Sequence, residues 1–292
     1  MSDDIRKAAI ALYDRFTHEG LDRRLFMGRM VALTGSLAAA EVLVGAIAAS
    51  PAAAVVVPEN DPRLRAEMTT MPGTSDLPRY SAYVAEPRAK SLEAAVMVVH
   101  ENRGLNAHTK DVARRLAVAG FYAVAPDFLS PSGGTPADED AARDAIGKLD
   151  LAAATRAGVG MLEELAARVD GGGKVGAVGF CWGGAYVNRL TVAAGSKLGA
   201  GVVYYGPAPD PAEAAKVAAP LMIHVPELDD RVKATAWPWV EALRAADKTV
   251  TAYNYPGANH AFNNDTSAER YDKAAADLAW RRTLRHFRQH LR

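Results

Sequence analysis

The chain is poor in cysteine and carries no excess of charge of either sign. Its 292 residues include one cysteine, and 34 basic residues balance 34 acidic ones. A single cysteine excludes an intrachain disulfide and a C-x-x-C redox pair. A basic stripe interleaved with aromatic residues is also missing, so we expect no nucleic-acid partner. Hydrophobic residues make up 49% of the chain, which is enough to build one large domain, alone or with an extension.

The one cysteine, Cys181, lies in the sequence G-F-C-W-G-G directly after the apolar run 174–178. Glycines stand two residues before and two residues after it, which is the G-x-S-x-G nucleophile-elbow pattern with sulfur in place of oxygen. In such an elbow a strand turns sharply into a helix, and the helix N-terminus favours a thiolate. The alternative interpretation is an inert thiol that fills the core. The flanking glycines favour a nucleophile.

An acid and a histidine follow the cysteine, each after a predicted strand. The strand at 221–225 is followed by P-E-L-D-D-R-V, and the strand at 250–255 by P-G-A-N-H-A-F. The order nucleophile, acid, histidine is the chain order of α/β-hydrolases. His260 is the candidate base, and a carboxylate on its other nitrogen would fix its tautomer. Asp229 and Asp230 both fit as the acid. We favour Asp229, with Asp230 as a helix cap or a partner of Arg231.

A further apolar run, expected to be a strand buried on both faces, ends in H-E-N-R-G-L from His100 onward. In an α/β-hydrolase the loop after this strand donates one N–H to the oxyanion hole, and Trp182, next to the nucleophile, would donate the other. Glu101 and Arg103 also fit a surface ion pair. The spacing of His100 and His108 matches no metal motif, so we expect no metal site.

Apolar runs alternate with helical segments along the body of the chain. We predict strands at 79–84, 94–99, 121–125, 174–180, 201–205, 221–225 and 250–255, and helices at 109–119, 137–169, 183–194, 234–246 and 272–291. Gly147 is a candidate break in the longest helix. This alternation predicts an α/β fold with a mostly parallel sheet and helices on both faces. Each candidate site residue follows a strand, at the edge of the sheet where function gathers in such folds.

The first 57 residues form an N-terminal extension with two interpretations, and residues 58–292 form the hydrolase domain. Arg23-Arg24, the apolar run 30–49 and an A-x-A sequence at 52–54 resemble a twin-arginine export signal. Glu41 lies inside the apolar run, which argues against export and against stable membrane insertion. Export with cleavage would place the protein in the periplasm, and retention would leave it in the cytoplasm.

The residues before the two arginines favour a retained helical arm. Apolar residues share one helical face and charged residues the other. The apolar face holds Ile5, Ala9, Leu12, Tyr13 and Phe16, and the charged face holds Asp4, Lys7 and Asp14. We expect such an arm to pack on the body of the protein or on a second copy, which would make a homodimer.

Four sequence blocks together resemble the dienelactone hydrolase (carboxymethylenebutenolidase-like) family. These are V-V-H-E-N-R-G-L, G-F-C-W-G-G, E-L-D-D-R-V and Y-P-G-A-N-H-A-F, and the similarity extends over roughly 58–292. The resemblance implies a three-layer α/β-hydrolase fold without a large cap. It also implies hydrolysis of a small lactone or activated ester through a thioester, with no metal or organic cofactor.

The resemblance also assigns roles to individual residues. It implies a triad of Cys181, Asp229 and His260, with the backbone N–H groups of Asn102 and Trp182 as oxyanion donors. It further implies that the carboxylate of Glu101 holds the resting thiol away from the histidine and shifts when substrate binds.

The chain departs from the family pattern in one place. Family members bind the substrate carboxylate with arginines, one of them a few residues past the histidine, but here F-N-N-D follows at 262–265. Arg103 or Arg143 are candidate replacements, and we expect Arg103 to bind substrate. This departure argues against dienelactone itself as the substrate. The alternative to an enzyme is a non-catalytic small-molecule-binding protein on the same scaffold.

Overall fold

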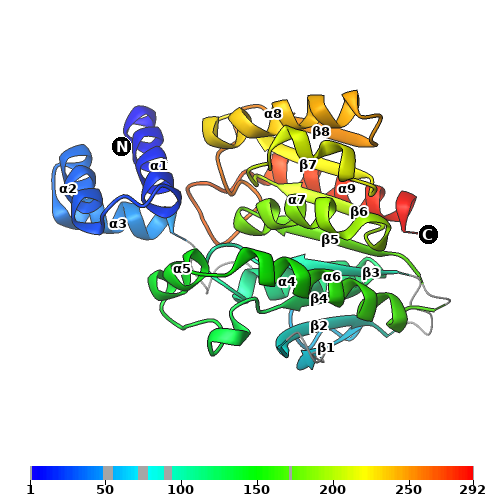
Figure 1. Cartoon of the computed structure of the whole chain (residues 1–292). Coiled ribbons are helices and arrows are strands. Elements are labelled where there is room, and N and C mark those ends of the chain that lie inside the picture. Colours follow the sequence, from blue (N-terminus) through cyan, green and yellow to red (C-terminus); the bar gives the residue numbers. More distant parts are fainter. Residues whose placement is uncertain (1, 49–54, 72–77, 89–93, 171–172, 292) are drawn as a thin grey trace.

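A computed structural model describes residues 2–48, 55–71, 78–88, 94–170 and 173–291. A mixed eight-stranded sheet runs through the body in the order β1-β2-β4-β3-β5-β6-β7-β8 (Figure 1). The strands from β3 onward pair in parallel, whereas β2 is antiparallel to both β1 and β4. The bounds are β1 Leu64–Met71, β2 Tyr80–Pro87, β3 Ala95–Val99, β4 Tyr122–Pro126, β5 Val175–Phe180, β6 Ala200–Tyr204, β7 Leu221–Pro226 and β8 Val250–Tyr255.

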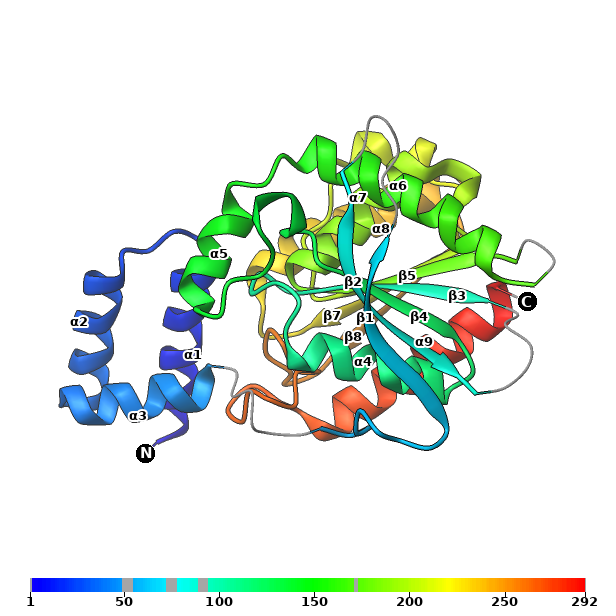
Figure 2. The ribbon, with the colours of Figure 1, turned by 90° about the horizontal axis from the view of Figure 1, so that it is seen from below.

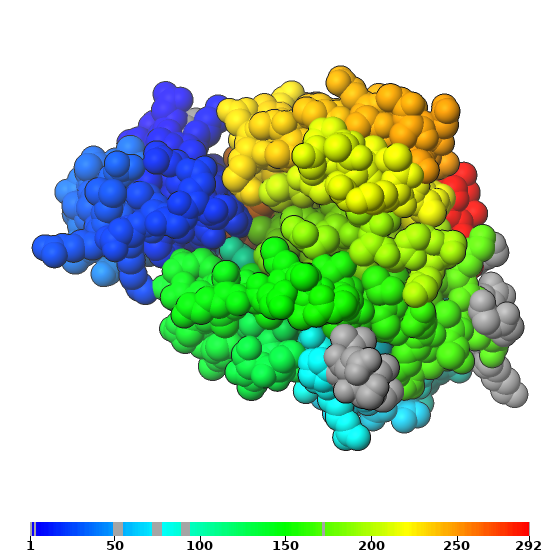
Figure 3. Space-filling model, viewed as in Figure 1, coloured from blue at the N-terminus to red at the C-terminus, as the bar shows by residue number. Residues whose placement is uncertain are grey.

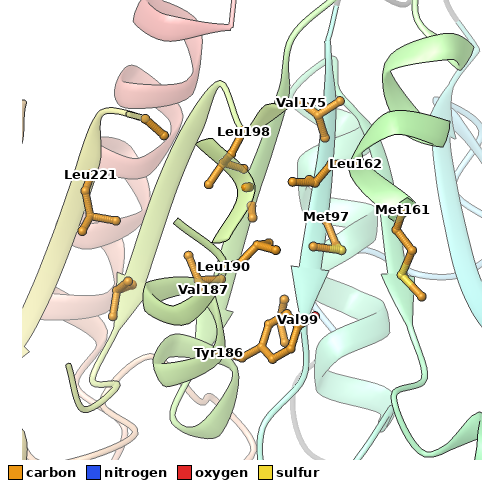
Figure 4. Close-up of a cluster of buried hydrophobic side chains, with 14 of the residues drawn as sticks. Met97, Val99, Met161, Leu162, Val175, Tyr186, Val187, Leu190, Leu198 and Leu221 are labelled. Carbon is orange, nitrogen blue, oxygen red and sulfur yellow. The ribbon is translucent and has the colours of Figure 1, made fainter. Parts of the chain in front are cut away.

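Helices cover both faces of the sheet. One apolar core lies beneath α6, α7 and α8, and a second lies beneath α4 and α9 on the opposite face (Figure 2). Figure 4 shows the first core, where Met97 and Val99 of β3 lie near Leu162 of α6 and Val187 of α7. The bounds are α4 Ala107–Val118, α5 Glu139–Gly147, α6 Leu151–Arg168, α7 Trp182–Ala194, α8 Asp230–Ala245 and α9 Lys273–His290. These three layers confirm the predicted fold class.

The predicted strands and helices correspond to observed ones, with boundaries shifted by a few residues. The long helix predicted at 137–169 is two helices, and the first of them ends at Gly147 as expected. Helix α8 begins at Asp230, four residues earlier than predicted. Strand β1 was not predicted, because it lies at the sheet edge and only its two end residues are buried.

The N-terminal arm consists of α1 (Asp3–His18), α2 (Arg23–Thr34) and α3 (Leu37–Ile47). These helices pack on one another around a small apolar core of their own, which includes Ala9, Tyr13, Phe26 and Met30. In Figure 3 the arm (blue) forms a lobe that lies against one end of the body. The expected apolar face of α1 is buried, except that Ile5 is partly exposed.

Within the described part of the chain, no single helix is long and apolar enough to cross a membrane. Helices α2 and α3 taken together have the necessary length and composition, but they are bent by 108° relative to each other. The expected A-x-A cleavage sequence at 52–54 lies outside the described residues.

Candidate active site

Cys181 occupies a strained turn between β5 and α7. Its φ of 55° is in the left-handed region, which residues other than glycine rarely adopt. A Cβ added to Gly179 would lie 2.0 Å from the carbonyl oxygen of Gly183, and one added to Gly183 would lie 2.4 Å from that of Val99. Only glycine fits at these two positions. The turn therefore has the elbow geometry that the sequence predicts, with the cysteine at the N-cap of α7.

Asp229 and His260 form a close buried pair. His260 Nδ1 donates to Asp229 Oδ2 at 2.5 Å, and Asp229 Oδ1 accepts from the backbone N–H of Val232 at 3.1 Å. Burial alone would raise the pKa of Asp229, but the His260 imidazolium outweighs this effect and lowers it. Asp229 thus both caps α8 and orients the histidine.

The neighbouring carboxylate lies away from the histidine. The side chain of Asp230 is 95% exposed and pairs with Lys233 at 2.7 Å. Of the two adjacent acids, Asp229 is therefore the one in contact with His260. The expected capping role of Asp230 is wrong because Asp229 holds that position, and the expected partner Arg231 lies instead 3.7 Å from Asp229.

The structure brings the thiol and the imidazole of His260 together. Donor atoms of Cys181, His260 and His18 all lie within 4.8 Å of one another. His260 Nε2 is buried without a hydrogen-bond partner. Burial lowers the pKa of His260, but the negative charges of Cys181 and Asp229 outweigh it and raise this pKa to about 10. The electrostatics therefore favour the imidazolium form of His260.

The two expected oxyanion donors belong to residues near the thiol. Trp182 is the first residue of α7, where a helix leaves its backbone N–H groups without partners inside the helix. Its indole ring stacks on His100 with ring centroids 5.3 Å apart. Asn102 lies in the loop after β3, and its side-chain amide donates to the carbonyl of Thr17 in the arm at 3.3 Å.

Glu101 is buried beside the site, and its two oxygens are held by different residues. The Tyr205 hydroxyl donates to Oε1 at 3.4 Å, and the Asn264 side-chain amide donates to Oε2 at 3.1 Å. No sequence pattern indicated either partner. His100 has a structural role, because Nδ1 donates to the Glu101 carbonyl at 2.7 Å and Nε2 accepts from the backbone of Phe128.

The arginines near the site all contact other groups of the chain. Arg103 lines the pocket and donates to Glu139 at 2.6 Å and to the Tyr13 hydroxyl at 2.9 Å. Arg143 does not line it and instead stacks on the ring of Phe16 in the arm. Arg270, which the sequence analysis did not select, is buried in the pocket wall.

His18 is the site residue that sequence analysis missed most clearly. Both of its ring nitrogens lie 3.9 Å from Cys181 Sγ, and its ring centroid lies 4.6 Å from that of His260. Because the sulfur is equally far from both nitrogens, neither nitrogen points straight at it. Burial, then His260 and the nearby arginines, hold the pKa of His18 well below its usual range, so the ring is neutral.

With the arm in place, the space above the thiol is very small. The pocket lined by Cys181, His260 and Arg270 has a volume of about 20 Å³, room for a single water. Larger hollows of about 270 Å³ beside β1 and about 570 Å³ beside α5 include none of the site residues. The candidate site residues therefore lie at the small pocket and not at the larger hollows.

Known proteins resemble the chain over most of its length. It is 30% identical over 259 residues to an Escherichia coli K12 protein named "Putative carboxymethylenebutenolidase", and the match covers 83% of this chain and 94% of that protein. It is 31% identical over 235 residues to a Bradyrhizobium protein named "Probable 2-oxo-3-(5-oxofuran-2-ylidene)propanoate lactonase", which covers 72% of this chain and 89% of the relative.

Solved structures show the same fold. A Klebsiella pneumoniae protein titled "Putative Dienelactone Hydrolase" superposes with a TM-score of 0.70 at 28% identity, covering 78% of this chain and 99% of that one. A dienelactone hydrolase of Anabaena variabilis gives 0.60 at 18% identity, which supports the fold alone. The model of the dienelactone hydrolase family matches residues 80–291. The chain therefore belongs to the dienelactone hydrolase family and is a hydrolase of ester or lactone bonds.

Proposed function

We propose that the protein is a cysteine-dependent hydrolase that cleaves a lactone or activated ester through a thioester intermediate. One observation carries this proposal. Cys181 lies at an elbow close to the imidazole of His260, whose Nδ1 is bound by Asp229 and whose Nε2 has no hydrogen-bond partner. A nucleophile, a base and a group that orients the base are the parts that acyl transfer needs.

In the first half of the reaction the Cys181 thiolate attacks the carbonyl carbon and forms a C–S bond. The electron pair of the C=O bond moves to oxygen, where the backbone N–H groups of Asn102 and Trp182 would stabilise it, each worth about 3–4 kcal/mol. When the oxyanion collapses, the bond to the leaving oxygen breaks. His260 gives its Nε2 proton to that oxygen. In a lactone the leaving group stays attached to the acyl chain.

In the second half a water molecule cleaves the thioester. Neutral His260 takes one proton from the water, and the hydroxide oxygen adds to the thioester carbon. The C–S bond then breaks and the thiolate leaves. The product is a carboxylic acid, and the enzyme returns to thiolate and imidazolium. Throughout the cycle Asp229 keeps Nδ1 protonated and Nε2 directed at the sulfur.

The substrate class follows from this chemistry and from the relatives. A thiolate needs a carbonyl whose leaving oxygen departs readily, as in enol lactones and aryl esters. The named Bradyrhizobium relative is a lactonase for a lactone ring with an acidic side chain. We propose that the carboxylate of Glu101 turns toward the sulfur of Cys181 when substrate binds. To do so, it must first break its hydrogen bond with Tyr205 or with Asn264.

Assays of Cys181→Ser and Cys181→Ala against a panel of aryl esters and lactones test the proposal. We expect Cys181→Ala to lose turnover, and mass spectrometry of the wild type to detect one acyl group on the peptide that contains Cys181. Iodoacetamide should inactivate the wild type at this one thiol. Normal turnover by a folded Cys181→Ala variant would refute the cysteine mechanism.

A further inference from the structure

The C-terminal end of α1 covers the proposed nucleophile. His18, the last residue of the helix, lies 3.9 Å from Cys181 Sγ and stands tilted against the ring of His260. Cys181 is only 5% exposed, and residues of α1 line the small pocket beside it. In the described conformation the ring of His18 leaves little room beside the sulfur for a substrate carbonyl.

Two further contacts join α1 to the loop that follows β3. The Asn102 side chain donates to the backbone carbonyl of Thr17, and Arg103 donates to the Tyr13 hydroxyl. This loop is the expected source of one oxyanion donor. The arm is therefore bound to the catalytic loop as well as to the thiol.

A buried arginine anchors the middle of α1. Asp14 Oδ1 lies 3.4 Å from Arg270 Nη1, and the guanidinium lies over the ring of Tyr13 at 5.1 Å. The Arg270 side chain is only 7% exposed, so it needs a negative partner to offset the cost of its burial. The nearby carboxylate of Asp14 supplies that charge from the arm.

The contacts between arm and body are mostly polar. Arg6 pairs with Glu269 at 2.8 Å and Arg23 with Asp140 at 2.5 Å, both at partly exposed positions. The apolar side chains of the arm pack chiefly among themselves, in a core separate from the two cores of the body. Water can replace polar contacts of this kind, so the arm can leave its seat as a folded unit without opening a hydrophobic core.

We propose that α1 is a lid of the active site, which closes the site by placing His18 over Cys181 and Asp14 on Arg270, and that substrate enters when α1 leaves this seat. The pocket beside Cys181 has a volume of about 20 Å³, room for one water, whereas a lactone with its substituents is several times larger. The role of the lid in catalysis rests on the proposed function. The closure itself rests only on the contacts of the arm.

The rate at which iodoacetamide alkylates Cys181 in the full-length protein measures opening, because the reagent is too large for the closed pocket. Asp14→Ala removes the carboxylate that Arg270 needs only while the arm is seated. We expect this variant to be alkylated about tenfold faster or more. Asp4→Ala is the matched control on the same helix, since Asp4 is exposed. We expect it to react at the wild-type rate.

Turnover and hydrogen exchange complete the test. If substrate needs the open state, kcat/KM of Asp14→Ala for an aryl ester rises by the same factor as the alkylation rate. Hydrogen exchange should be faster in α1 and unchanged in β3 and β5, which shows that the body remains folded. An alkylation rate in Asp14→Ala equal to that of Asp4→Ala, with β3 and β5 still protected, would overturn the lid.

The two proposals fail separately. Alkylation needs only an accessible thiol. If Asp14→Ala is labelled faster but the protein hydrolyses no ester, the proposed function is refuted and the lid proposal is still supported. In a protein that does hydrolyse the ester, faster labelling without a rise in kcat/KM would show that opening does not admit substrate, which contradicts the lid. His18→Ala provides a second variant, which should also speed alkylation because it removes the ring that covers the sulfur.

Discussion

Asp229→Asn should remove the negative charge of the proposed triad acid while keeping the size of its side chain. Asparagine has nearly the same size, and its side-chain oxygen can still accept from the backbone N–H of Val232, as Asp229 does at 3.1 Å. The helix cap is therefore kept. What is lost is one negative charge 2.5 Å from His260 Nδ1. The variant therefore tests the effect of the Asp229 charge on His260 alone.

The size of the effect follows from the pKa of His260. Burial by itself lowers this pKa, yet Cys181 and Asp229 raise it from 6.5 to about 10. Removal of the Asp229 charge therefore lowers the pKa of His260, and each unit of that change is worth about 1.4 kcal/mol of imidazolium stabilisation. In the wild type the imidazolium persists until the pH rises through about 10. In the variant the imidazolium should be lost at a lower pH.

Two measurements test this reasoning. The pH dependence of the histidine ring signals, followed by NMR, should show the His260 titration shifted down in Asp229→Asn. The alkaline limb of kcat/KM should shift with it, and the maximal rate should fall by about 10³- to 10⁴-fold because the tautomer is no longer fixed. Asp230→Asn is the matched control, since this neighbouring side chain is 95% exposed. A His260 titration unchanged in Asp229→Asn would refute the proposed electrostatics.

Two further predictions concern the elbow and the donor cluster. Gly183→Ala places a methyl group 2.4 Å from one backbone oxygen and 2.5 Å from another at the end of β3. We therefore expect the free energy of unfolding to fall by about 3 kcal/mol or more, as measured by denaturant unfolding. A loss below about 1 kcal/mol would show that β3 and α7 separate easily. Zn²⁺ prefers imidazole and thiolate ligands, and the donor atoms of His18, Cys181 and His260 lie within 4.8 Å of one another. Micromolar Zn²⁺ should therefore inhibit the wild type, and His18→Ala should weaken that inhibition about tenfold or more. Equal inhibition of both proteins would exclude His18 as a ligand.

The parallel part of the sheet was predictable because strands buried on both faces have continuous runs of apolar residues in the sequence. Every residue of β3 and β5 is buried, and both strands were located within one residue of their bounds. Strand β1 carries no such run. It pairs antiparallel at the edge, where most of its side chains face solvent. Its position is set by pairing with β2, and no local pattern in its own sequence specifies that pairing.

The candidate triad was predictable because topology brings the ends of parallel strands to one edge of the sheet. The choice between Asp229 and Asp230 was harder, because adjacent residues have the same propensities. The residue at which α8 begins determines which of the two carboxylates contacts His260. The residue at the N-cap turns its carboxylate back toward the backbone and the neighbouring loop, whereas the first helical residue, Asp230, points outward. A one-residue shift of the helix would exchange the two.

The contacts of the arm could not be predicted from sequence. His18 and Cys181 are separated by 163 residues, and Asp14 and Arg270 by 256. The helical pattern of α1 indicated an apolar face, but that face packs mainly inside the arm. Of the residues that meet the site, Tyr13 belongs to that face, whereas Thr17 and His18 are polar residues beside it, and Asp14 was assigned to the charged face. A polar flank gives no sign of its partner until the tertiary structure is known.

The twin-arginine pattern and the lid use the same segment in incompatible ways. Arg23 and Arg24 lie at the exposed start of α2, while Met30, Leu43 and Ile47 of the apolar run are buried in the arm. An export signal must present its apolar run to the translocation machinery, whereas the lid requires that run to be packed. One molecule cannot do both at once. Export would have to use the segment before the arm folds, and cleavage at 52–54 would remove His18 and Asp14 together. The two interpretations of the N-terminal segment therefore predict opposite states of the thiol, covered in the retained chain and open in the cleaved one.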